Sequence, residues 1–448
     1  MAVNLRPRPT ARDVGPAIIG ILVVALAALW IVAMPAGQST GSYIGQLLGA
    51  ESILLLSIAL VLISTLPWVE VWFDGIDRAA IWHRRVAITG LVLLAPHILM
   101  SSNPEGGTAL GGPLGAIGAL GLLGLVLWAI LPRWRSVVPG PLRGLVVAAR
   151  DAPLIRDVRR IFGGYERWRA LHRTTGLFVA AGFLHGALDG SPFDESAVLR
   201  WSYLAIGGIG LAFYVYRELL SRHFLSLHDY QVAGVARIDE GLVEITLAPI
   251  GRHVDFVPGQ FAMVYIESKD GWHRHPFTIA SAPHEGVVRV TVKALGDYTS
   301  RLQEILEPGM PAVIGGPHGR FSHTKGTDRQ VWIAGGVGVA PFLSWLRALD
   351  GDLSPGVDVF YAADGDAPFA DEIRGIADQH DSLSAHVIDT STAGRLTTHD
   401  VLTTAGGDAE GLSVFMCGPQ GMLRAFQPQL RAAGVPARNI HREYFDWR

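Results

Sequence analysis

Four histidines occur in two hydrophobic segments at matching spacings, and their side chains could bind a metal-centred cofactor. The spacing is 14 from His83 to His97 in one segment, and 13 from His172 to His185 in the other. On helices that rise about 1.5 Å per residue, each pair spans roughly 20 Å, about two-thirds of a hydrocarbon core that is about 30 Å thick. Neutral imidazole is a good axial ligand of haem iron. Two such helices side by side would place one His–His pair near each membrane face and bind two haems.

The alternative is that the histidines form hydrogen bonds between helices. One histidine in a membrane segment is readily explained in that way, but four in two matched pairs favour ligands. His83 would pair with His172 on the inner side, and His97 with His185 on the outer side. A spacing of 14 returns to nearly the same helical face, whereas a spacing of 13 does not. The second segment must therefore bend, twist or contain a π-type irregularity, unless one ligand is misassigned.

The composition limits the kinds of redox site that the chain can hold. Its 448 residues allow two or three domains, and the 49% hydrophobic content is concentrated before about residue 220. The net charge of −3 and the lack of a basic, aromatic-rich stretch give no indication of nucleic-acid binding. The single cysteine, Cys417, excludes an intramolecular disulfide and any multi-cysteine zinc or iron–sulfur site. Redox chemistry must then use organic cofactors or haem.

Six apolar segments are candidates for membrane spans. Several are at the short end of the length that a spanning helix needs, which is about 20 residues. The first is followed by another apolar segment rather than by a cleavage site and a soluble domain, so we do not interpret it as a signal peptide. The six segments are 16–35, 44–66, 83–100, 114–131, 171–188 and 201–216.

Arginines are concentrated in alternate connections of these segments. Residues 1–15 contain three, the second connection ends in Arg84 and Arg85, and residues 132–170 contain nine. By contrast, residues 36–43 have no charged side chain, and residues 101–113 have only Glu105. The positive-inside rule then predicts a multi-pass protein of the inner (cell) membrane with both termini cytoplasmic. The second half would lie where NAD(P)H is found.

The segment His275-Pro276-Phe277-Thr278 follows a predicted strand and has residue types that suit a flavin. Phe277 could pack against the isoalloxazine, and Thr278 could form a hydrogen bond with its N5 edge. The alternative is an ordinary strand end.

A second segment, 292–299, contains Lys293, Gly296 and Thr299. Its glycine permits close backbone approach, and its hydroxyl and amides could bind a pyrophosphate.

A glycine-rich turn directly follows the predicted strand 330–334 and opens a helix. The glycines would let the backbone approach a dinucleotide pyrophosphate at the helix N-terminus. The turn is Gly335-Gly336-Val337-Gly338-Val339-Ala340-Pro341.

Two further positions follow predicted strands in this region. Asp364, after the strand 359–363, would bind the adenosine ribose 2′-hydroxyl and repel a 2′-phosphate, which favours NADH. Arg395 would reverse this preference if it reached the same pocket. Cys417-Gly418-Pro419 follows the strand 412–416 and would lie near the nicotinamide. Its alternative is a plain strand-ending turn.

These patterns predict a multi-domain fold. Residues 1–222 would form a six-helix transmembrane bundle. Residues 223–326 would form an antiparallel β-barrel that binds FAD, because short alternating runs such as 241–249 and 287–295 are typical of its strands. Residues 327–448 would form an α/β nicotinamide domain with a parallel sheet.

With these motifs placed, the chain resembles the ferric reductase and NADPH oxidase superfamily, in its compact bacterial form. The resemblance rests on the paired histidine spacings, on residues 275–278 and 335–341, and on Cys417-Gly418-Pro419. It implies that the third and fifth spans each give one ligand to each of two haems b. It also implies that a C-terminal aromatic covers the flavin until the nicotinamide displaces it, which would be Phe445 or, as runner-up, Trp447. Asp364 departs from the basic or hydroxyl residue that phosphate-selecting relatives tend to carry.

The expected function is electron transfer from cytoplasmic NAD(P)H through FAD and two haems to an outer-face acceptor, either oxygen, giving superoxide, or ferric iron. Thr278, Cys417 and Phe445 would serve the hydride step. One alternative is an electron-supplying subunit for a periplasmic partner enzyme. Another is a membrane-anchored flavin reductase in which the four histidines are structural. A non-enzymatic haem sensor is disfavoured by the flavin and nicotinamide motifs.

Overall fold

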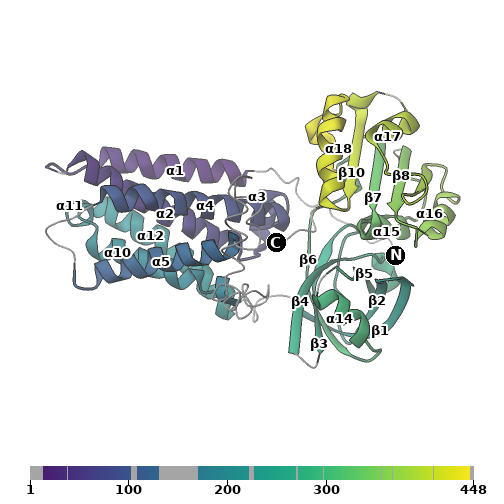
Figure 1. Ribbon diagram of the computed structural model, residues 1–448, viewed down its shortest axis with the longest axis horizontal. Helices are drawn as coiled ribbons and strands as arrows, with labels where there is room; N and C mark the ends of the chain where they lie inside the picture. The colour runs from purple at the N-terminus through teal and green to yellow at the C-terminus, as the bar shows by residue number, and fades with distance from the viewer. Residues whose placement is uncertain are drawn as a thin grey trace, which may run out of the picture. The chain divides into compact units, whose positions relative to one another are not determined.

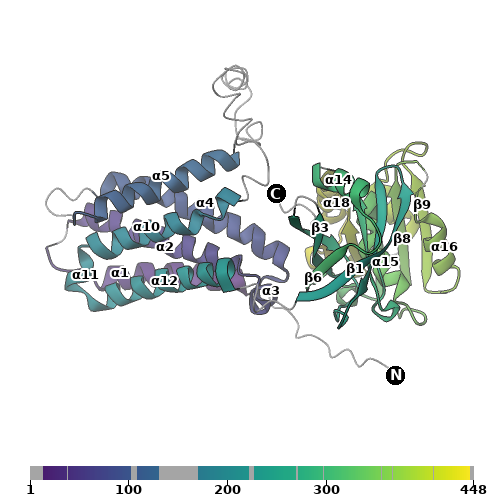
Figure 2. The ribbon, with the colours of Figure 1, turned by 90° about the horizontal axis from the view of Figure 1, so that it is seen from below.

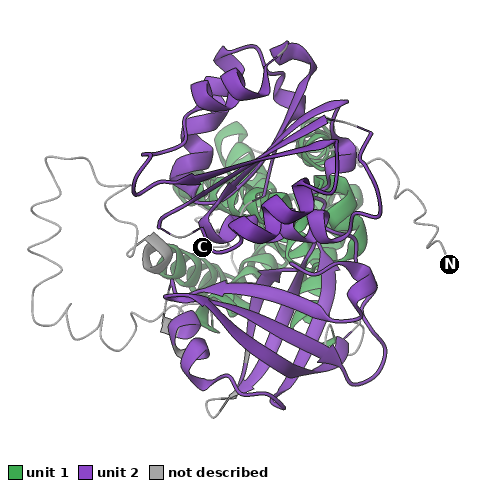
Figure 3. Cartoon of the chain, turned by 90° about the vertical axis from the view of Figure 1, so that its right-hand side faces the viewer, with its two compact units in different colours: residues 1–223 green, residues 224–448 purple. Residues whose placement is uncertain are grey.

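The structure is a computed structural model, and its residues fall into two compact units, 1–223 and 224–448 (Figure 3). Each unit is described by itself. The residues described are 14–37, 39–101, 108–130, 170–220, 227–268, 271–295, 297–354, 356–365, 367–406 and 408–443.

The first unit is helical, with one long helix for each of the six predicted apolar segments (Figures 1 and 2). Short helices α3 (Pro67–Phe73) and α11 (Pro192–Glu195) and a π-helical turn at Tyr216–Leu220 lie between or after them. The long helices are α1 (Gly15–Val32), α2 (Thr40–Leu62), α4 (Ile76–Met100), α5 (Gly111–Ile130), α10 (Thr175–Asp189) and α12 (Ala197–Val215).

Among the described residues of this unit, three segments are long and apolar enough to cross a membrane. They are α1, α2 and the continuous stretch Ala197–Leu220, while the apolar part of α5, Gly111–Val126, is shorter. The N-terminal half is therefore a helical region compatible with a membrane protein. This criterion of length and apolar composition supports three of the six predicted spans.

Helix α2 is the central element of the unit, since it packs against α1, α4, α10 and α12. Its apolar side chains enter three separate hydrophobic clusters. The N-terminus of α2 is capped by Ser39, whose hydroxyl accepts a hydrogen bond from the Ser42 amide. Because α2 contacts helices on several sides, it sets the positions of its neighbours along its axis.

Glycines in α5 allow close packing against α10, because small residues let two helix backbones approach. A Cβ at Gly118 would lie 2.9 Å from the Gly182 amide nitrogen, and one at Gly121 would collide with the Phe178 ring. Gly124 has no such neighbour.

The spacing of 13 between His172 and His185 would put them on different faces of one helix, but the helix is interrupted between them. His172 ends a short helical stretch, a turn follows at Arg173 and Thr174, and α10 begins only at Thr175. The two histidines therefore do not lie on one continuous helix, and their spacing of 13 need not return to one face.

The second unit begins with a six-stranded antiparallel sheet in the order β4-β3-β6-β1-β2-β5. An isolated bridge from Ile279, just after β4, to Val290 of β5 brings the two edges of the sheet together. Apolar side chains from all six strands, with Phe277 as the contribution of β4, enclose one core, and α14 (Asp297–Ile305) packs against it. The strands are β1 (Leu227–Asp239), β2 (Leu242–Pro249), β3 (Phe261–Ser268), β4 (Gly271–Thr278), β5 (Val288–Lys293) and β6 (Pro311–His318).

A five-stranded parallel sheet follows, in the order β11-β10-β7-β8-β9. The chain leaves β7 on one side to form β8 and β9 and later returns to its other side as β10. Ligands bind outside the carboxyl ends of strands at such a reversal point. The strands are β7 (Arg329–Gly335), β8 (Gly356–Ala363), β9 (Leu383–Asp389), β10 (Leu412–Cys417) and β11 (Ile440–Arg442). The helices are α15 (Ala340–Arg347), α16 (Ala370–Ala377), α17 (Thr398–Ala405) and α18 (Gln420–Ala432).

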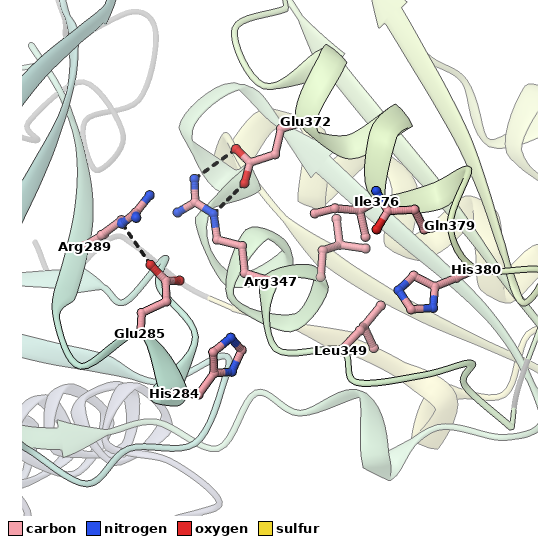
Figure 4. A pocket seen from close by; sticks show the side chains of 10 residues that line it. His284, Glu285, Arg289, Arg347, Leu349, Glu372, Ile376, Gln379 and His380 are labelled. Atoms are coloured by element: carbon pink, nitrogen blue, oxygen red, sulfur yellow. Dashed lines mark hydrogen bonds and ion pairs between the residues drawn. The ribbon is translucent and has the colours of Figure 1, made fainter.

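A largely buried arginine at the end of α15, Arg347, links the two sheets of this unit, and Figure 4 shows its paired hydrogen bonds to Glu372. The Arg347 guanidinium donates to both carboxylate oxygens of Glu372 in α16 and to Glu244 of β2, at 2.7 to 3.0 Å. It also donates to the Ala280 carbonyl. The six-stranded and five-stranded sheets are thus joined by charge-assisted hydrogen bonds, the strong class of such bonds.

Candidate functional site

The four histidines of the first unit form two face-to-edge pairs. The ring centroids of His83 and His172 are 6.3 Å apart at an interplanar angle of 85°, and those of His97 and His185 are 6.3 Å apart at 67°. The pairing across helices is the one that the spacings predict. One pair lies near the start of α4 and the other near its end.

Three of the four rings have a fixed tautomer. The Nδ1 atoms of His83, His97 and His185 lie 2.9 Å from the carbonyl oxygens of Ala59, Gly45 and Gly111, respectively. A carbonyl only accepts, so Nδ1 carries the proton and Nε2 keeps its lone pair. Metal-binding histidines use this arrangement, with one ring nitrogen on the metal and the other donating to a carbonyl.

Glycines in the neighbouring helices make room for the pair formed by His97 and His185. A Cβ at Gly49 of α2 would lie 2.6 Å from His97 Nδ1, and one at Gly115 of α5 would lie 3.0 Å from the His185 ring. Asp189, one turn after His185, places a carboxylate oxygen 3.6 Å from His185 Nδ1. The sequence pattern predicts the four histidines but not these supporting residues, because a glycine or a backbone carbonyl beside a ring has no sequence pattern of its own.

In the second unit, the predicted flavin segment forms the end of β4. Phe277 is half-buried, whereas Thr278 is 5% exposed, and its Oγ1 has no hydrogen-bond partner within the described ranges. A buried hydroxyl without a partner is costly unless a ligand supplies one. Thr278 therefore fits a group with a polar edge, such as flavin N5.

His275 has a partner that the sequence did not indicate. Its ring stacks on Tyr298 of α14, with centroids 3.9 Å apart and planes inclined by 14°. This contact joins the two predicted flavin segments. In the second segment, Lys293 ends β5 with an exposed side chain, and the Thr299 hydroxyl accepts a hydrogen bond from the Leu295 amide. Gly296 lies outside the described residues.

The two predicted nicotinamide turns pack against each other at the reversal point of the parallel sheet. A Cβ at Gly338 would lie 2.3 Å from the Cys417 carbonyl oxygen, and one at Gly335 would lie 2.9 Å from Pro419 Cδ. Gly336 has φ of +52°, in the left-handed region that side chains disfavour. Pro341 occupies the first turn of α15. Glycine is thus required at three positions of the turn.

Cys417 is fully buried, and its thiol faces a carboxylate that the sequence analysis overlooked. Cys417 Sγ lies 3.8 Å from Glu443 Oε2, and the Glu443 amide donates to the Met416 carbonyl. Burial first, and then the charge and hydrogen bond of Glu443, raise the pKa of the Cys417 thiol well above its usual value. The group is therefore a neutral thiol beside a buried acid. Phe445 and Trp447 follow directly but lie outside the described residues.

Asp364 is exposed at the carboxyl end of β8, as predicted. A second carboxylate, Asp389, ends the neighbouring strand β9. Its oxygens accept from the Gly365 amide, the Ser391 amide and hydroxyl, and the Thr392 hydroxyl. The Ser391 hydrogen bonds, followed by those of Thr392 and Gly365, lower the pKa of Asp389. The hydroxyls of this loop are therefore engaged with a carboxylate.

Comparisons with known proteins match the second unit. Residues 227–339 match the family of FAD-binding domains, and residues 332–428 match the oxidoreductase NAD-binding domains. The chain is 29% identical over 216 residues to a flavohemoprotein of Chromobacterium violaceum, covering 42% of this chain and 53% of that protein. It is 29% identical over 144 residues to mouse NADPH oxidase 1, covering 31% and 24%, respectively.

Rat dual oxidase 2 is also 29% identical over 135 residues, covering 25% of this chain and 9% of that protein. The chain thus spans about half or less of the length of these relatives. The FAD/NAD-binding domain of a Vibrio cholerae nitric oxide dioxygenase aligns with 21% identity and a TM-score of 0.43, over 48% of this chain and 97% of that one. The predicted resemblance to NADPH oxidase-type fusions of an FAD-binding and an NAD-binding domain is confirmed for this half of the chain.

Proposed function

We propose that this chain, an NAD(P)H-dependent oxidoreductase with an FAD-binding and an NAD-binding domain, transfers electrons across a membrane. The electrons would pass from cytoplasmic NAD(P)H through FAD and two b-type haems to an acceptor at the outer face. The six long helices of the first unit would be the membrane domain, with both termini cytoplasmic as the arginine bias predicts.

The observation that carries this proposal is the 6.3 Å separation in both histidine pairs. If both rings of a pair bound one metal ion through bonds of about 2.0 Å, with about 1.1 Å from each bonding nitrogen to its ring centre, the two ring centres would lie about 6.2 Å apart. Within the described ranges there is no cluster of three or more His, Cys, Asp or Glu side chains that could hold a metal. Two ligands suit haem, whose porphyrin supplies the other four, and not a structural zinc ion.

Separate sets of residues would bind the haems, the flavin and the dinucleotide. His83 and His172 would be the inner pair of ligands, and His97 and His185 the outer pair. Thr278 would donate to the flavin edge, and the turn Gly335–Pro341 would hold the dinucleotide pyrophosphate at the start of α15. When bound, FAD accepts a hydride and releases single electrons, and haem carries single electrons across the bilayer.

The four histidines indicate only the class of electron acceptor, not its identity. If His97 and His185 both held the outer haem, they would leave no site on the iron for an acceptor, which would take its electron at the haem edge. Oxygen, giving superoxide, and a ferric chelate both fit such a transfer. Purified protein in vesicles with NADH separates the possibilities by oxygen consumption, superoxide formation and reduction of a ferric chelate. Reduction of haem by NADH without turnover of any of these would favour a periplasmic partner enzyme.

The test of the haem proposal is the absorbance spectrum of the detergent-purified protein, oxidised and then after NADH. We expect a low-spin haem b spectrum that NADH reduces in the presence of FAD. His97→Ala should lose about half of the haem, while the exposed His399→Ala serves as the control. If the flavin bleaches and no haem band exists, the proposal fails, and the protein is a membrane-anchored flavin reductase.

A further inference from the structure

A carboxylic acid is buried in the middle of the central helix. Glu51 is the twelfth residue of the 23-residue helix α2 and is only 5% exposed. Neither of its carboxylate oxygens has a hydrogen-bond partner within the described residues. It therefore lies inside the helix and not at a frayed end. Ionisable residues inside membrane segments are costly and tend to be functional.

The depth of Glu51 is set by the carbonyls that hold the histidines. Gly45, six residues before Glu51, accepts from the outer His97, and Ala59, eight residues after it, accepts from the inner His83. At about 1.5 Å per residue, Glu51 lies roughly 9 Å along the axis from the first carbonyl and roughly 12 Å from the second. The acid is therefore placed between the two histidine pairs.

The side chain leaves α2 on the face away from the ligands. Glu51 is two residues from Gly49, which abuts the His97 ring, so at about 100° per residue it points to the opposite side of the helix. One turn to either side, Leu47 and Leu55 belong to apolar clusters that contain Leu26 and Ile19 of α1. The carboxyl group thus faces an apolar environment.

No other ionisable side chain lies at this depth on the described helices that pack against α2. Residues 15–32 of α1, 86–96 of α4, 175–184 of α10 and 204–213 of α12 contain none. Tyr203 donates its hydroxyl to the Phe183 carbonyl. The nearest ionisable groups are at the two ends of these helices: His83, Arg84, Arg85 and His97 on α4, His185 and Asp189 on α10, and Arg200, Tyr203 and Tyr214 on α12.

We propose that Glu51 is a redox-linked proton site, which rests on the proposed binding of haem by the two histidine pairs. Ferric iron in a porphyrin dianion has a net charge of +1, and ferrous iron has none. While the haems are ferric, their positive charge is the counter-charge for a Glu51 carboxylate at this depth. Once an electron arrives that counter-charge is lost, and an unpaired carboxylate in an apolar interior is strongly disfavoured.

The coupled step conserves charge. One electron from the reductase half reduces one haem iron from ferric to ferrous, and one proton from water converts the Glu51 carboxylate into a carboxylic acid. When the electron leaves at the outer face, the acid releases its proton. The site would therefore lower the electrostatic cost of placing an electron in the middle of the membrane domain.

The experiment is a redox titration of the haems in the purified full-length protein between pH 5.5 and 8.5. In the unchanged protein, the midpoint potential should fall with rising pH, by up to about 59 mV per pH unit for one proton per electron. Glu51→Gln keeps the shape of the side chain and should remove most of this slope. Glu195→Gln, an exposed acid in α11, should keep it.

Infrared difference spectra, reduced minus oxidised, provide a second readout that needs no variant. We expect a carboxylic-acid C=O band that appears on reduction, shifts in D2O and is lost in Glu51→Gln. No such band in the unchanged protein, or an equal pH slope in Glu51→Gln, would overturn the inference. Absence of haem would instead overturn the proposed function.

Discussion

The carbonyl oxygen of Gly45 in α2 lies 2.9 Å from Nδ1 of His97. The same helix also provides the carbonyl that accepts from His83, near the other end of α4. Ala59, further along α2, holds His83, and the spacing from Gly45 to Ala59 equals the spacing from His83 to His97 on α4. Because α2 and α4 run antiparallel with a constant register, α2 fixes the depth of both rings. The spacing of the two proposed haems would thus be a property of this helix pair.

Room for the His97 ring depends on the absence of a side chain at Gly49. A Cβ there would lie 2.6 Å from Nδ1, so Gly49→Val should displace the ring. We expect the haem content of the purified protein to fall by about half, because the inner pair is unaffected. Gly41→Val, in the same helix with open space around its Cα, is the matched control and should keep the full content. Equal haem content in both variants would contradict this account of the outer pair.

The pairing of the histidines could be predicted from the sequence because spacing along a helix converts directly into depth. The spacing of 13 also predicts an irregularity in the second segment. Its position at Arg173 and Thr174 could not be predicted, since neither residue is a helix breaker and the turn forms in its tertiary context. The strand–turn–helix motif around Gly335 was predictable because its glycines are a local requirement. Glu443 was missed because its partner Cys417 is distant in sequence. Asp389 was missed although Ser391 and Thr392 lie close to it in sequence, because a lone acid has no pattern.

The orphaned hydroxyl of Thr278 predicts a specific kinetic effect. Thr278→Val keeps the shape of the side chain and removes the donor to the flavin edge. We expect FAD to remain bound and flavin reduction by NADH to slow by about tenfold, as for the loss of one hydrogen bond of about 1.4 kcal/mol. Stopped-flow absorbance of the flavin measures this rate. Thr246 is a half-buried residue of β2, and Thr246→Val is the control that should leave the rate unchanged.

The carboxyl ends of β8 and β9 predict a preference for NADH. Asp364 is exposed where the adenosine ribose would lie, and the Ser391 and Thr392 hydroxyls that could bind a phosphate donate to Asp389 instead. Asp364→Ser should raise the ratio of kcat/KM for NADPH over NADH by about ten- to hundredfold, since it replaces a repelling charge with a donor. The exposed Asp381→Ser should not change the ratio. A preference for NADPH in the unchanged enzyme would refute the prediction.

The buried ion pairs of Arg347 should matter more than an exposed pair of the same chemistry. Arg347 is 9% exposed and links Glu244 to Glu372, whereas Arg252 and Asp255 form a pair whose side chains are 82% and 86% exposed. Arg347→Met leaves a buried acid and should destabilise the reductase half by about 3 kcal/mol. Arg252→Met should cost less than about 1 kcal/mol. Thermal release of FAD fluorescence from the full chain compares the two, and similar midpoints would show that the Arg347 link is not stabilising.

The single cysteine makes the pH behaviour of Cys417 directly measurable. Burial and then the Glu443 carboxylate raise the pKa of its thiol, so the folded protein keeps it neutral where an unfolded cysteine, near pH 8.5, already ionises. This contribution to stability is therefore complete below about pH 8.5 and is lost as the pH rises towards the pKa of the folded state. Alkylation by iodoacetamide should be very slow between pH 7 and 9 in the native protein and complete after denaturation.

The Glu443 contribution can be separated from burial with one variant. Glu443→Gln removes the negative charge 3.8 Å from Sγ but keeps the size of the side chain, so the pKa of Cys417 should fall and alkylation should begin at a lower pH. Glu240→Gln, an exposed acid in the turn between β1 and β2, should leave the profile unchanged. If the profiles of Glu443→Gln and the unchanged protein coincide, burial by itself keeps the thiol neutral, and the carboxylate next to the nicotinamide turn has a role other than holding the Cys417 proton.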